Sequence, residues 1–131
     1  MERLIYASRA VWPAPSQAME DILRVSVPAN AGAEITGALG HSDQTYVQLL
    51  EGPAEALDAL MEKLMADPRH EDLRVLSREA VARRMLPTWT MARADLVQHK
   101  ADVARLLEAG DAVALMALLA SLVHLRQTST V

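Results

Sequence analysis

The sequence contains no cysteine, and this absence excludes a disulfide framework, a zinc site built on thiolates and a cysteine nucleophile. Clusters of basic residues are missing as well. The 13 Lys and Arg residues face 17 Asp and Glu residues, which gives a formal net charge of −4. A protein that follows a nucleic-acid backbone needs clustered cations to replace the counterions, so the composition disfavours nucleic-acid binding.

Targeting and metal-binding signals are also lacking. The N-terminal residues MERLIYAS have neither the basic start nor the apolar run of a signal peptide. The longest apolar stretch, 112–123, is interrupted by Ser121 and is too short to cross a bilayer. We therefore expect a cytoplasmic protein without membrane contact. We also predict no metal site, because no ligand spacing relates the four histidines, His41, His70, His99 and His124.

Aromatic residues are scarce, and phenylalanine is absent. Leu, Val and seven Met must therefore fill the core that 131 residues, of which 51% are hydrophobic, can form as one domain. Each aromatic position is informative when so few exist. The four are Tyr6, Trp12, Tyr46 and Trp89.

The periodicity of apolar residues predicts an alternation of strands and helices. Strands are predicted over 3–8, 35–41, 45–51 and 73–76, with a fifth inside 84–92 around 89–91. Helices are predicted over 16–26 and from Gly52-Pro53 to Asp67-Pro68, with a loop over 28–32. The order βαββαβ with a fifth strand indicates an α+β, ferredoxin-like sandwich.

Two further helices are predicted at the C-terminal end. The first covers 102–109 and ends at Gly110, and Asp111 caps the second, which runs to about Arg126. This last helix is apolar almost all round, so the open face of the sheet or another chain must cover it. We expect a core over 1–93 and a helical cap over 94–131.

Gln48 lies within the apolar strand of residues 45–51, where a buried amide needs hydrogen-bond partners. It shares a strand face with Tyr46, and Tyr6 alternates in the same way on the first strand. Tyr6 alone is typical of a core tyrosine, whereas a Tyr–Gln pair beneath helices indicates a ligand. The segment 67–70 fits either a helix stop with solvated charges or a pair of groups facing an anion.

Five segments, taken together and in this order, resemble the BLUF family, the sensors of blue light using flavin. The resemblance extends over residues 1 to about 93. Its elements are RLIYAS (3–8), Asn30 followed by ITGAL (35–39), VQLLEG (47–52), DPRH (67–70) and WTM (89–91). Four positions depart from the family pattern, Ala29, Gly40, Tyr46 and Met85. Tyr46 stands where Phe is common and adds a second oxidisable phenol, and Gly40 replaces a usually large apolar residue.

The resemblance implies a flavin ring between two helices and a light-driven hydrogen-bond switch, in which Gln48 bridges Tyr6 and the flavin. FAD is the expected cofactor, with FMN or riboflavin also accepted. The resemblance implies apolar walls for the ring from Ile22 and Leu64, with Ser26 nearby, and a contact of Asn30 with the polar edge of the ring. It implies contacts of Arg69 and His70 with the ribityl-phosphate end. It also implies signal relay through Trp89 and Met91.

The resemblance further implies a photoreceptor without enzymatic activity that signals to a separate downstream protein or through self-association. The apolar last helix favours a homodimer. Two other classes remain open: an enzyme on this fold, either a small flavin oxidoreductase or an acylphosphatase-like hydrolase, and a light-insensitive oligomerising module. The sequence has no Gly-rich phosphate loop, no HExxH and no nucleophile elbow.

Overall fold

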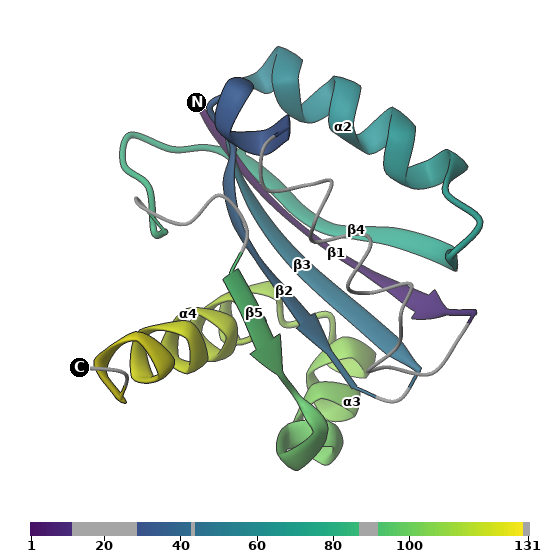
Figure 1. Ribbon diagram of the computed structural model, residues 1–131. Coiled ribbons are helices and arrows are strands. Elements are labelled where there is room, and N and C mark those ends of the chain that lie inside the picture. The colour runs from purple at the N-terminus through teal and green to yellow at the C-terminus, as the bar shows by residue number, and fades with distance from the viewer. Residues whose placement is uncertain (12–28, 43, 87–91, 130–131) are drawn as a thin grey trace.

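The structure, a computed structural model, describes residues 1–11, 29–42, 44–86 and 92–129, with side chains up to residue 123 in the last range. Its strands form one sheet in the order β4-β1-β3-β2-β5 (Figure 1). They are β1 (Glu2–Ala10), β2 (Thr36–His41), β3 (Thr45–Gly52), β4 (His70–Ala80) and β5 (Ala92–Asp95). All neighbours are antiparallel except β2 and β5, which run parallel. The predicted α+β fold of ferredoxin-like type is confirmed.

Helices cover both faces of this sheet. Helix α2 (Ala54–Ala66) lies on one face, and α3 (Lys100–Ala109) and α4 (Ala112–Ser129) lie on the other, after the short 3-10 helix η1 (Val97–His99) (Figure 1). Two apolar cores result. The core under α2 contains Leu4, Tyr6, Leu39, Tyr46, Leu50, Leu57 and Met61. The core under α4 contains Ile5, Val47, Leu49, Leu86, Leu115, Met116, Leu119 and Val123.

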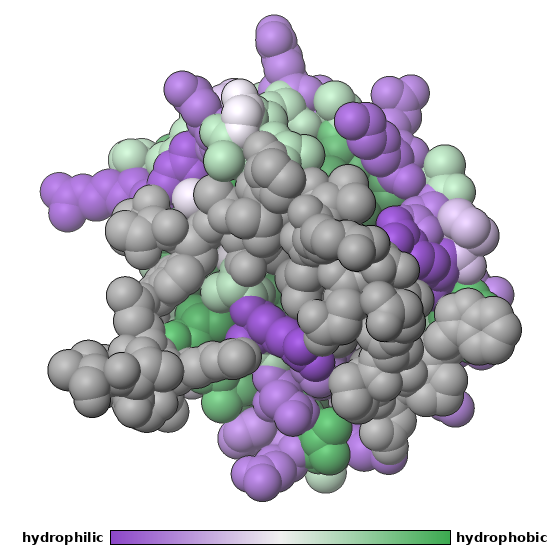
Figure 2. Space-filling view, in the orientation of Figure 1, coloured by the Kyte–Doolittle hydropathy of each residue, from purple (hydrophilic) through white to green (hydrophobic). Residues whose placement is uncertain are grey.

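The sequence of α2 explains its position. Leu57 and Met61 are four residues apart, so they lie on one side of the helix and are both buried against the sheet. Glu55 in the first turn and Lys63 in the last turn have the charges that the helix dipole favours. Hydrophilic side chains accordingly project from the outer side of the molecule near α2 (Figure 2). This helix therefore presents an apolar roof to the strands beneath it.

The junction between α3 and α4 confirms the predicted stop and cap. Gly110 ends α3 with φ of 68°, a left-handed conformation that glycine adopts without a steric penalty. The Oδ1 atom of Asp111 accepts a hydrogen bond of 3.0 Å from the N–H of Ala114, as an N-cap carboxylate does. The open sheet face does cover α4, through Leu115 and Leu119 among others.

Three expectations need correction or fall outside the described chain. The described part of the fifth strand is β5 at Ala92–Asp95, and the predicted centre at 89–91 lies outside the described residues. Residues 84–86, at the start of the predicted range, are not strand, and the Glu51 carboxylate binds the amides of Met85 and Leu86. Residues 29–32 are helical rather than a loop, and the Asn30 carbonyl accepts from the N–H groups of Ala33 and Ile35. The helix predicted over 16–26 lies outside the described residues.

The strand predicted over 73–76 is part of the longer β4. Within the part of the chain that the structure describes, no helix has the length and apolar character needed to cross a membrane.

Candidate functional site

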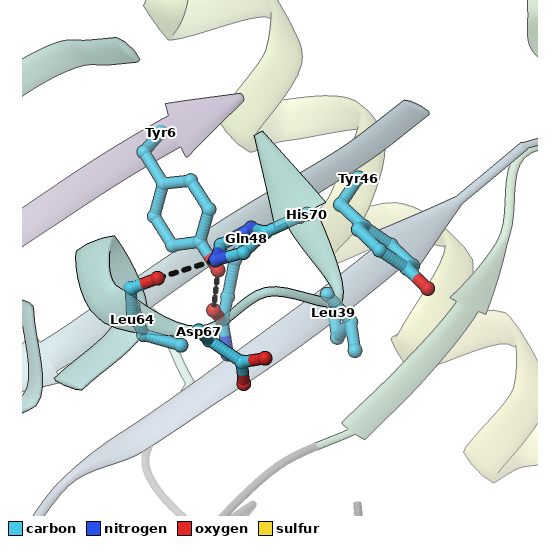
Figure 3. Close-up of a pocket in the computed structure, with 7 residues that line it drawn as sticks. All are labelled: Tyr6, Leu39, Tyr46, Gln48, Leu64, Asp67 and His70. Atoms are coloured by element: carbon cyan, nitrogen blue, oxygen red, sulfur yellow. Dashed lines mark hydrogen bonds between the residues drawn. The ribbon is translucent and has the colours of Figure 1, made fainter. Parts of the chain in front are cut away.

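A small cavity of about 10 Å³ lies between the carboxyl end of α2 and the face of the sheet beneath it. Residues of β1, β2, β3 and α2 line it, together with Asp67 of the α2–β4 connection and the start of β4 (Figure 3). The lining residues are Tyr6, Leu39, Tyr46, Gln48, Leu64, Asp67 and His70. The cavity therefore combines apolar walls with a few converging polar groups, as small-molecule sites commonly do.

Tyr6 and Gln48 form the polar centre of the cavity floor. The two residues are directly opposite each other in the β1–β3 pair, so the antiparallel register brings their side chains together. The Tyr6 hydroxyl donates a hydrogen bond to the Gln48 Oε1 atom (Figure 3). Both side chains are almost fully buried, at 2% and 3% exposure. The Gln48 oxygen thus accepts from Tyr6, and the amide NH₂ group at the same end of the side chain is a hydrogen-bond donor.

The electrostatic surroundings keep the Tyr6 phenol protonated. Burial raises its pKa, and the negative charge of Asp67 and the nearby Tyr46 raise it further. The pKa of Asp67 is lowered, mainly by its side-chain hydrogen bonds with Arg69, although partial burial works in the opposite direction. At neutral pH the site thus contains a neutral phenol close to an ionised carboxylate.

His70 ties α2 to the first strand. Its Nε2 atom lies 2.5 Å from the Leu64 carbonyl oxygen, and its Nδ1 atom lies 2.7 Å from Ser8 Oγ. A carbonyl can only accept, so Nε2 carries the proton, and in the neutral ring Nδ1 accepts from the Ser8 hydroxyl. The imidazole also meets the rings of Tyr6 and Tyr46 edge-on, with centroids 6.1 and 6.4 Å away. His70 consequently fixes the distance between the α2 wall and the cavity floor.

Arg69 is held by Asp67 in a two-pronged ion pair. Arg69 Nε lies 2.9 Å from Asp67 Oδ1, and Nη2 lies 2.6 Å from Oδ2. The Arg69 backbone N–H also donates to Oδ1 at 2.9 Å. Pro68 separates the two residues in the tight turn that leaves α2, which places the carboxylate and the guanidinium on the same side. The turn thereby presents a fixed, charge-compensated group at one end of the cavity.

The structure brings four of the predicted site residues together in the cavity, namely Tyr6, Gln48, Leu64 and His70. Asn30 is buried at 2% exposure and Arg69 pairs with Asp67, but neither belongs to the described lining. The roles of these residues toward a flavin stay predictions. The remaining predicted site residues, Ile22, Ser26, Trp89 and Met91, lie outside the described residues.

Sequence reasoning does not assign Leu39 or Asp67 to the site. Leu39 is directly opposite Gln48 in the β2–β3 hairpin, so the hairpin register contains the signal that identifies it. Asp67 precedes Pro68, a pattern typical of a helix stop, and this hides its second position beside Tyr6. Within the described chain, no group of three or more His, Asp or Glu side chains is arranged to hold a metal ion.

The residues present fit a flavin ring. Leu39, Leu64 and the Tyr46 ring supply apolar surface for a flat heterocycle, and the buried Gln48 amide supplies a donor for its polar edge. Tyr6 places an oxidisable phenol in direct hydrogen-bond contact with that amide.

Comparison with known proteins identifies related sequences and structures. The profile of one family, BLUF, described as sensors of blue-light using FAD, matches residues 1–92. The photoactivated adenylate cyclase subunit beta of Euglena gracilis is 35% identical over 92 residues, which are 70% of this chain and 11% of that protein. This chain therefore spans only a small part of the cyclase subunits that it matches.

Solved structures agree over a larger part of the chain. The dark-state structure of BlrB, a BLUF protein, is similar with a TM-score of 0.81 and 30% identity, and the match covers 92% of this chain and 95% of that one. BlrP1 of Klebsiella pneumoniae, solved with FMN and cyclic diGMP, is 32% identical with a TM-score of 0.67 over 72% of this chain and 26% of that one.

Proposed function

This chain belongs to the BLUF family of flavin-based blue-light sensors, and from that premise we propose that Tyr6 and Gln48 are its light-driven switch and FAD its flavin. The observation that carries the proposal is the buried hydrogen bond from the Tyr6 hydroxyl to the Gln48 amide inside the cavity. The family description supports FAD, and FMN or riboflavin would offer the same ring to the same residues.

When bound, the flavin supplies absorption of blue light and a strongly oxidising excited state. Tyr6 enters this chemistry as a neutral phenol, because its raised pKa retains the proton until an electron also leaves. Loss of one electron and one proton from Tyr6, followed by their return, leaves its net redox state unchanged. The Gln48 amide can then settle in a second orientation, in which its oxygen and nitrogen ends have exchanged partners.

The chain provides further groups to hold the cofactor. We assign Leu64 and Ile22 to the ring walls, with Ser26 nearby, and Asn30 to the polar edge of the ring. Arg69 and His70 are assigned to the ribityl-phosphate end, and the Asp67–Arg69 pair and the Ser8–His70 bond hold these two side chains in place before any ligand arrives.

We expect the purified protein to be yellow and its flavin bands to move reversibly to longer wavelength under blue light. Rearrangement of the Gln48 amide changes the hydrogen bonds at the ring edge, and a stronger bond at a ring carbonyl lowers the excitation energy. Absorption spectra before illumination, after it and after dark recovery provide the measurement. A flavin-loaded protein with an unchanged spectrum would indicate a light-insensitive module, and turnover of a nicotinamide would indicate an oxidoreductase.

We propose that residues 1–93 form the flavin-binding core and residues 94–131 the helical cap. The signal would leave the core through this cap. Trp89 and Met91 are the proposed relay residues. Helix α4 buries Leu115 and Leu119 against the sheet and leaves Val113, near its amino end, 74% exposed. We propose that the exposed surface around Val113 forms a homodimer in the cytoplasm and that a separate downstream protein binds it.

Light scattering over a concentration series tests the dimer. We expect a mass of twice 14.3 kDa for the wild type, and a shift toward monomer when Val113 is replaced by Glu, because a buried charge at a self-complementary contact is repeated on both subunits. A monomer at every concentration of the wild type contradicts the dimer without affecting the flavin switch.

A further inference from the structure

A single strand, β2, separates the flavin cavity from the helix proposed as the output. Leu39 lines the cavity on one face of β2. The next residue, Gly40, points to the opposite face because side chains alternate along a strand. On that face α4 packs against β2 and β5. The cavity and α4 thus lie on opposite faces of the same strand at this position.

Gly40 forms a notch that the side chain of Leu119 fills. A Cβ atom added to Gly40 would lie 2.5 Å from Leu119 Cδ2 and 2.7 Å from Leu96 Cδ1, well inside van der Waals contact. Leu119 is only 1% exposed, and Leu96 is equally buried. The neighbouring residues of this face, Ala38 and Ala94, are also small and buried. Helix α4 therefore reaches the backbone of β2, which a larger residue at position 40 would prevent.

We propose that the seating of Leu119 on Gly40 is the contact through which β2 passes a change in the cavity to α4, so that both are positioning residues for the output. This inference rests on the proposed flavin switch and on α4 as its output. The contact between Leu119 and the backbone at Gly40 is close-packed and leaves no free volume. A small displacement of β2 must therefore move α4 or leave the notch empty. Leu39 faces Gln48 across the β2–β3 hairpin, so a change at Gln48 would reach β2 through Leu39.

The two residues make opposite and complementary changes possible. Gly40→Ala places a methyl group 2.5 Å from Leu119 Cδ2 and 2.7 Å from Leu96 Cδ1, so both side chains must shift and the packing of α4 on β2 is disturbed. Leu119→Ala leaves the notch empty and removes the contact. In the double variant the methyl group added at position 40 occupies part of the space that Leu119 vacates, so the helix can return to the sheet. Gly32→Ala is the matched control, because an added Cβ there has open space around it.

The experiment compares these variants in the full chain loaded with flavin. Hydrogen exchange of α4 residues 112–123 is recorded in the dark and under blue light, beside the spectral shift and the dark exchange of the flavin-free protein. For the wild type and Gly32→Ala we expect illumination to alter exchange in α4. For Gly40→Ala we expect about tenfold or more faster exchange already in the dark, loaded or flavin-free, as overpacking implies. Its spectral shift should be retained, while its light-minus-dark difference in α4 falls to less than about half of the wild-type value.

The double variant separates coupling from general destabilisation. We expect Gly40→Ala with Leu119→Ala to recover dark protection and part of the light response relative to Gly40→Ala alone. A wild-type light response in Gly40→Ala, or effects of the two changes that simply add, overturns the proposal. The same holds if Gly40→Ala loses the spectral shift, since the notch then acts on the cavity. A wild type with a spectral shift but no change in α4 also overturns it, whereas a wild type without a shift contradicts the proposed switch.

Discussion

Replacing Tyr6 with Phe is expected to abolish the light-induced shift of the flavin bands while the protein still binds flavin. The change removes a single hydroxyl and keeps the ring that packs in the core beneath α2. That hydroxyl is the donor to Gln48 and carries the proton that must leave together with the electron. Phenylalanine is also far harder to oxidise than a phenol. Absorption difference spectra at matched flavin content measure the effect.

Tyr46→Phe is the matched control for this prediction. Tyr46 lines the same cavity and is equally buried, but its hydroxyl points away from the Tyr6–Gln48 pair (Figure 3). The variant should keep the shift. Gln48→Leu should lose it, since the switching amide is gone while the bulk remains. A shift that persists in Tyr6→Phe would contradict Tyr6 as the donor, and its loss in the double Tyr variant would then assign the donor role to Tyr46.

Much of the fold could be predicted because the strand pattern is local. Alternation in residues 3–8 and 45–51 predicts that Tyr6, Tyr46 and Gln48 share one face, and the β1–β3 register confirms that Tyr6 and Gln48 meet. The Gly110–Asp111 stop and cap depend on neighbouring residues only and are also confirmed. Features of this kind depend on propensities that act within a few residues.

The errors arise where distant residues decide the local structure. The sequence pattern allows the fifth strand to begin anywhere from residue 84, but the amides of Met85 and Leu86 bind a carboxylate that lies 34 and more residues earlier in the chain. The Asp67-Pro68 pattern predicts only the end of a helix. The position of Asp67 beside Tyr6 depends instead on how the chain returns from α2 to the sheet. Patterns of apolar residues do not encode such long-range polar contacts, so the sequence could not reveal them.

The carboxylate in question belongs to Glu51, and its replacement by Gln is expected to be strongly destabilising. Glu51 is fully buried and accepts hydrogen bonds from the N–H groups of Met85 and Leu86 at 2.8 and 2.7 Å. Its Oε2 atom also pairs with Arg3 Nε at 2.9 Å. One carboxylate thus joins β1, β3 and the segment that follows β4, and Leu86 is thereby held in the core beneath α4.

Glutamine keeps the shape but not the chemistry of this group. Its NH₂ end would face backbone donors, and the Arg3 guanidinium, which is 15% exposed, would lose its buried counter-charge and keep only the exposed Glu79 at 3.7 Å. Removal of one partner of a buried ion pair costs about 3–5 kcal/mol, a large fraction of the stability of a small domain. Urea unfolding followed by circular dichroism measures the loss in the free energy of unfolding. The dependence of this free energy on urea concentration, the m-value, is compared with that of the wild type.

Glu79→Gln is the control for this change, because Glu79 also faces Arg3 but from 3.7 Å and with 54% exposure. Water screens such a pair, so its loss should change the free energy of unfolding by about 0.5 kcal/mol or less. Equal effects of the two variants would contradict the argument, since burial and the backbone amides are what distinguish Glu51. A loss below about 1 kcal/mol for Glu51→Gln would mean that the segment 84–86 keeps its place without the carboxylate.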